Sequence, residues 1–79
     1  MKVYLIEESD YDDVTRHGIY LHKEKAIKKL KSLFKSQKKY WGKNNAYHPE
    51  WINNESFGIF SCDTYQAGTF QIIEEEVID

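Results

Sequence analysis

One segment constrains the fold of this 79-residue chain more than any other, the amphipathic stretch that runs from residue 23 to residue 40. Its apolar residues recur at intervals of three and four, which places them along one stripe of an α-helix. These residues are Ala26, Ile27, Leu30, Leu33, Phe34, Tyr40 and Trp41. Gly42 follows as a stop signal. The pattern predicts a helix over Lys23–Tyr40 whose apolar stripe lies on a sheet.

Short runs of β-forming residues flank this segment on both sides. Val3–Ile6 is a continuous apolar run, and Thr15–Leu21 alternates well enough for a second strand that pairs with the first as a hairpin. Phe57–Cys62 and Thr69–Val77 predict two further strands. We therefore expect a single α+β domain over residues 1–79, with the order ββαββ and one helix packed across one face of a four-stranded antiparallel sheet.

The polar stretch Lys43–Ser56 has two interpretations, a long loop or a short helical turn that starts near Pro49. The predicted strands carry apolar residues on both faces, which indicates that the face away from the helix is also covered. The cover is either this stretch, with Tyr47 and Trp51 folded back over the sheet, or a second copy of the chain, or a different partner.

Aromatic residues make up 15% of the chain, a high share. Such residues fill small cores, but Trp and Tyr also dominate the energetics of protein interfaces. Trp41, Tyr47 and Trp51 gather at and after the end of the predicted helix. We interpret these three as the candidate partner-binding residues.

Lysine is concentrated in the helix, because nine of the eleven cationic residues lie between positions 23 and 43. The residues of the ridge opposite the apolar stripe, here called the basic ridge, are Lys25, Lys28, Lys31, Lys35 and Lys39. Glu24 is the one acidic residue of the helix, so pairs of Glu and Lys are nearly missing from it. The ridge is either a solvated outer face or a phosphate-binding surface. The net charge of −2 and the lack of Arg in the ridge weigh against nucleic acid.

Acidic residues occupy two other segments, one after the first predicted strand and one at the end of the last. They are Glu7, Glu8, Asp10, Asp12, Asp13, Glu74, Glu75 and Glu76. If the first and last strands are neighbours, these residues form one acidic patch that faces away from the lysines and guides a basic partner. The alternative is a role in solubility and in the protection of edge strands.

No pattern for catalysis, metal binding or a cofactor stands out. Cys62 is a lone thiol, which is typical of a small buried hydrophobe. His17, His22 and His48 lack the spacing of zinc ligands. We expect neither an enzyme nor a metal or cofactor site. Without a leader or a membrane-spanning run, we expect the protein in the cytoplasm.

Two segments together resemble a known family. The segment Gly18–Ala26 has the sequence GIYLHKEKA, and Phe70–Glu75 has the sequence FQIIEE. This combination is similar to a family of short uncharacterised proteins of phages and bacteria, from which the segment between Gly42 and Gly68 departs. The resemblance implies an origin in a phage or mobile element and supplies no site residues.

These observations favour a small non-catalytic protein-binding module, encoded by a phage, that modulates or inhibits a host protein in the host cytoplasm. The first alternative is nucleic-acid binding through the basic ridge. The second is a self-associating structural protein, such as a homodimer, which the two-sided strands would explain.

Overall fold

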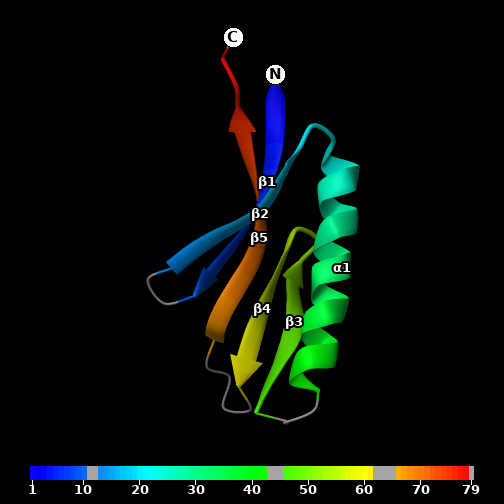
Figure 1. The fold of residues 1–79 in the computed structure, drawn as a ribbon, viewed down its shortest axis with the longest axis vertical. Coiled ribbons are helices and arrows are strands. Elements are labelled where there is room, and N and C mark those ends of the chain that lie inside the picture. Colours follow the sequence, from blue (N-terminus) through cyan, green and yellow to red (C-terminus); the bar gives the residue numbers. More distant parts are fainter. Residues whose placement is uncertain (11–12, 43–45, 62–65, 79) are drawn as a thin grey trace.

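The computed structural model of the chain describes residues 1–10, 13–42, 46–61 and 66–78 (Figure 1). Its elements are β1 (Lys2–Asp10), β2 (Asp13–Tyr20), α1 (Lys23–Trp41), β3 (Tyr47–Asn53), β4 (Ser56–Ser61) and β5 (Gln66–Glu76). The strands form one five-stranded antiparallel sheet in the spatial order β2-β1-β5-β4-β3. The expectation of four strands in the order ββαββ is therefore wrong, because the order is ββαβββ.

The additional strand, β3, lies within the stretch that sequence reasoning assigned to a loop or a helical turn. β3 is an edge strand, and an edge strand accepts Pro49 because one of its sides needs no hydrogen-bond partner. The backbone N–H of Glu55 donates to Asn53 Oδ1 at 2.7 Å, which stabilises the tight turn between β3 and β4. Asn53 and Asn54 thus lie at a hairpin turn. Lys43–Asn45 lie outside the described residues.

β1 extends beyond the predicted Val3–Ile6 and includes part of the acidic segment that follows those residues. It pairs with β2 on one side and with β5 on the other. Glu7 and Glu8 are accommodated in the strand because β2 supplies Arg16 and His17 as their partners. The predicted hairpin of the first two strands is confirmed. The first and last strands are neighbours in the sheet.

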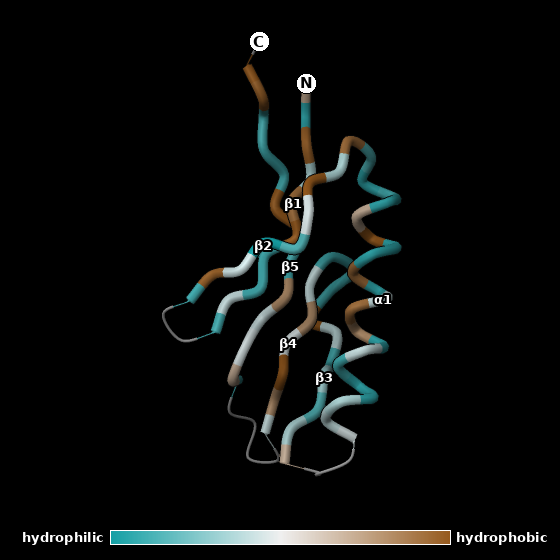
Figure 2. The backbone as a smooth tube through the Cα atoms, viewed as in Figure 1, coloured by the Kyte–Doolittle hydropathy of each residue, from teal (hydrophilic) through white to brown (hydrophobic). Residues whose placement is uncertain are grey.

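The main core lies between α1 and one face of the sheet. Ile6, Leu30, Phe57, Ile59 and Phe70 are its buried residues. The rings of Phe57 and Phe70 stack with their centroids 4.6 Å apart across β4 and β5. Figure 2 shows hydrophobic stretches in β4 and β5, and the colour of α1 alternates along its length as expected of an amphipathic helix. The helix begins at the predicted residue and ends one residue later, at Trp41.

The opposite face of the sheet carries a row of apolar residues across three strands. Leu5 pairs in register with Ile19 of β2 and with Ile73 of β5. Side chains alternate along a strand, so Leu5 faces away from the core residue Ile6 and from α1. Ile19 is 66% exposed at the edge of this row. The interpretation that the segment with Tyr47 covers this face is wrong, because Tyr47 packs against the core on the side of α1.

Candidate binding site

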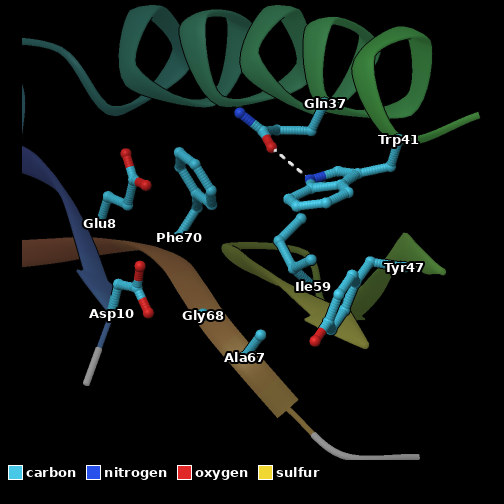
Figure 3. Close-up of a pocket in the computed structure, with 9 residues that line it drawn as sticks. All are labelled: Glu8, Asp10, Gln37, Trp41, Tyr47, Ile59, Ala67, Gly68 and Phe70. Atoms are coloured by element: carbon cyan, nitrogen blue, oxygen red, sulfur yellow. Dashed lines mark hydrogen bonds between the residues drawn. The ribbon is translucent and has the colours of Figure 1, made fainter. Parts of the chain in front are cut away.

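A cavity of about 230 Å³ opens between the last turns of α1 and the sheet (Figure 3). The end of α1 lies over one side of it, and β1, β3, β4 and β5 supply the remaining walls. The residues that line it are Glu8, Asp10, Gln37, Trp41, Tyr47, Ile59, Ala67, Gly68 and Phe70. Most of the exposed lining is apolar, while the two carboxylates come from one strand, β1.

A β-bulge in β5 creates the space for this cavity. The pairing of β4 with β5 shifts by one residue where Ile59 opposes Gly68 and Phe60 opposes Gln66, so Ala67 is the extra residue. A bulge turns a side chain out of the usual alternation, which explains why Ala67 and Gly68 both line the cavity in Figure 3. Two of the smallest residues therefore lie where the rest of the sheet presents large core side chains.

Two aromatic residues form the wall opposite the carboxylates. Trp41 is the last residue of α1 and Tyr47 the first residue of β3, and their ring centroids lie 5.0 Å apart. The indole N–H of Trp41 donates to Gln37 Oε1 at 2.8 Å, one helical turn earlier. This hydrogen bond fixes the orientation of the indole ring, so the aromatic wall is already ordered without a ligand.

The carboxylate wall is partly ordered as well. Glu8 Oε1 lies 2.7 Å from His17 Nε2, and the imidazole stacks on Phe70 with a centroid distance of 5.6 Å. Asp10 is exposed at the end of β1 and forms no ion pair with any residue that the structure describes. No Lys or Arg of the described segments lines the cavity. The cavity therefore combines an apolar, aromatic interior with a negative rim.

The structure brings together two of the three predicted partner-binding residues and separates the third. Trp41 and Tyr47 share the cavity, whereas Trp51 lies further along β3. The Trp51 ring stacks on Phe34 of α1 at 4.7 Å and meets the edge of Phe57 at 5.4 Å. Trp51 is 40% exposed, so most of its surface packs against the core. It joins β3 to α1 and does not belong to the cavity.

The basic ridge lies on the solvent side of α1, as the sequence pattern predicts. All five lysines of the ridge are exposed, and none forms an ion pair within the described segments. Lys23 differs from them, because it forms an ion pair with Glu55 in the turn between β3 and β4. The hydrogen bond and charge of the Glu55 carboxylate raise the pKa of Lys23 above its ordinary value.

The acidic residues do not form the single patch that the sequence suggested. Glu74, Glu75 and Glu76 pair in register with the start of β1, whereas Glu8 and Asp10 lie toward its other end. The antiparallel pairing of β1 and β5 causes this separation, because it sets the end of one strand beside the start of the other. Asp13 is the first residue of β2. Asp12 and Cys62 lie outside the described residues.

Five lining residues of the cavity were missed by sequence reasoning, namely Gln37, Ile59, Ala67, Gly68 and Phe70. The available signal was Gly68 next to a strand pattern, since glycine within a strand often marks a bulge. Gln37 gave a weaker signal as the polar residue one turn before Trp41 on the apolar side of the helix. Trp41 and Tyr47 were both predicted as binding residues, but only the fold shows that their rings lie in contact.

Comparison with known proteins finds no matching family model, no matching curated protein and no matching solved structure. Within the described ranges, α1 is the one helix, and it is not both long and apolar enough to cross a membrane. The resemblance to phage and bacterial proteins stays a prediction from the sequence.

Proposed function

We propose that this protein is a non-catalytic binding module that recognises a partner protein through the cavity beside Trp41 and Tyr47. The observation that carries the proposal is an ordered, open cavity with aromatic walls on a small domain. Aromatic residues in a preformed pocket are typical anchors of protein interfaces. The sequence resemblance supports the further proposal that the protein comes from a phage and modulates a host protein in the host cytoplasm.

The size of the cavity favours a protein partner over a cofactor. Pockets for drug-sized molecules and cofactors generally measure about 300–1,000 Å³, and this cavity measures about 230 Å³. It holds one side chain or a short segment of a partner. The surrounding surface then supplies the rest of the interface, which for a stable complex covers roughly 800 Å² on each partner.

The test is a capture experiment from a nuclease-treated bacterial lysate with the tagged full chain. Ala67→Leu fills the cavity and leaves its aromatic and acidic residues in place. A matched control, Lys28→Glu with Lys35→Glu, changes the exposed ridge of α1 and leaves the cavity intact. We expect one stoichiometric protein with the wild type and the control, and its loss with Ala67→Leu. Equal capture by Ala67→Leu, at unchanged circular dichroism, contradicts the proposal.

The basic ridge supports a second candidate function, the binding of nucleic acid. Five exposed lysines lie on one side of a 19-residue helix, and none of them forms an ion pair within the described segments. Each phosphate that a lysine neutralises adds to the salt dependence of binding. The proposal predicts binding to duplex DNA or RNA that weakens as salt increases and weakens further with Lys28→Glu. No change in fluorescence anisotropy of labelled nucleic acid at low salt excludes it.

Self-association is a further prediction from the sequence. It would use the face that carries exposed Ile19 and half-buried Ile73. Sedimentation at several protein concentrations measures self-association directly.

A further inference from the structure

We propose that the cavity binds the side chain of an arginine of the partner protein, between the aromatic wall and the carboxylates of Glu8 and Asp10. The inference rests on the proposed function and names the chemistry that the cavity selects. Three observations support it, namely the shape of the cavity, its aromatic wall and its charge.

The shape suits a long, unbranched side chain. Ile59, Ala67 and Gly68 provide an apolar floor, and the carboxylates lie at one side of it in Figure 3. An arginine has three methylene groups that pack along apolar surface and a charged head that can reach polar atoms beyond it. The arrangement of the cavity, with an apolar floor and an acidic rim, matches this division of the side chain.

The aromatic wall favours a planar cation. Trp is the strongest aromatic partner of a cation, and arginine is the cation that most often occupies such positions. A guanidinium group also stacks on an aromatic ring, which the compact ammonium of lysine does not do. The hydrogen bond from Trp41 to Gln37 holds the indole in place before a ligand arrives, so little conformational entropy is lost on binding.

The charge of the cavity excludes acidic partners and favours basic ones. Among the described lining residues, the two that carry a charge at neutral pH are Glu8 and Asp10, and both are acids. The imidazole of His17 already lies within hydrogen-bond distance of Glu8 Oε1. Asp10 has no cationic partner within the described part of the chain. A guanidinium forms charge-assisted hydrogen bonds to carboxylates, often two at a time, so an arginine supplies the charge that the rim lacks.

The experiment is an NMR titration of the ¹⁵N-labelled full chain with the blocked tripeptide acetyl-Gly-Arg-Gly-amide. The comparison peptide contains citrulline, which has nearly the shape of arginine and no charge. The indole N–H signals of the two tryptophans separate the sites, because Trp41 lines the cavity and Trp51 does not. We expect a saturable shift of the Trp41 signal at millimolar peptide, a static Trp51 signal, and binding of the citrulline peptide that is at least tenfold weaker.

Two variants test the role of the rim. Asp10→Asn keeps the shape of the side chain and removes its charge. We expect this variant to bind the arginine peptide roughly tenfold more weakly. Glu75→Gln removes an exposed acid that lies outside the cavity, and we expect no change. Equal affinity of the arginine and citrulline peptides, or unchanged affinity of Asp10→Asn, overturns the inference.

Different experimental results would show that this inference is wrong and that the proposed function is wrong. If the arginine peptide leaves Trp41 unaffected while Ala67→Leu still abolishes capture of a protein, the cavity binds a partner by another side chain and the arginine assignment is wrong. If Ala67→Leu leaves capture intact, the proposed function itself is wrong.

Discussion

The replacement Trp51→Ala separates a structural role of this residue from a role in binding. Trp51 stacks on Phe34 and meets Phe57, and it is 40% exposed. A fully buried Trp removes about 200 Å² from water, so the covered part of Trp51 amounts to roughly 120 Å². At about 25 cal/mol per Å² this gives about 3 kcal/mol. The unfolded chain already buries part of this surface, which reduces the expected loss of unfolding free energy to about 2 kcal/mol.

A loss of this size leaves the domain folded. A domain of this length has a free energy of unfolding of roughly 5 kcal/mol, so the variant retains more than half of it. The expected fall in melting temperature is about 10–15 °C, since 1 kcal/mol corresponds to roughly 4–8 °C in a domain of this size. Phe57→Ala is the matched comparison at a fully buried position, where we expect a loss of about 3–5 kcal/mol.

Urea unfolding followed by far-ultraviolet circular dichroism measures both variants, because this signal does not depend on the tryptophan that is removed. A loss below about 0.5 kcal/mol for Trp51→Ala, the range of ordinary surface substitutions, would refute the packing role derived from the ring contacts. Complete unfolding would show that the core depends on Trp51 more than its exposure allows.

Three further predictions concern stability and charge. Gly18 has a φ of 128°, and an added β-carbon would lie 3.1 Å from the Tyr20 hydroxyl oxygen. Gly18→Ala should therefore lower the free energy of unfolding by about 1–3 kcal/mol. Urea titration measures this change, and an unchanged midpoint contradicts the prediction. The pKa of Lys23 is raised above 10.5 by Glu55, so the ion pair contributes below pH 10.5 and its contribution is lost as the pH rises through the raised pKa. Lys23→Met should remove this alkaline loss, and an identical pH profile in the variant argues against the pair. Lys28→Glu with Lys35→Glu should change stability by less than about 0.5 kcal/mol because both side chains are exposed, and a larger loss in thermal unfolding shows that the ridge packs.

The helix and the pairing of the first strands were predictable because their signals are local. The apolar stripe of α1 needs only the period of the helix, and Gly42 marks its end. β1 and β2 are close in sequence and form the expected hairpin. β3 was not predicted because an edge strand lacks the apolar pattern of a buried one, and its Asn residues and Pro49 are typical of loops.

Only part of the candidate site could be predicted, because the rest depends on contacts between strands that are far apart in the sequence. Trp41 and Tyr47 were identified from residue type alone, since large aromatics at the end of a helix are typical of interfaces. The carboxylates join them only because β1 pairs with β5, and the bulge at Ala67 then opens the space between. Both of these are long-range properties of the sheet. The acidic residues at the two ends of the chain illustrate the same limit, since antiparallel pairing set them apart.

Site-specific crosslinking tests the central claim most directly. A photoreactive benzoyl-phenylalanine replaces Tyr47, whose ring lines the cavity, or His48, the next residue along β3, whose side chain points to the opposite face of the sheet. After irradiation in a nuclease-treated lysate, mass spectrometry identifies the attached peptide. The account predicts a single partner protein crosslinked at Tyr47 through a segment that contains arginine, and little crosslinking at His48. Equal crosslinking at both positions, or none at Tyr47, would contradict it.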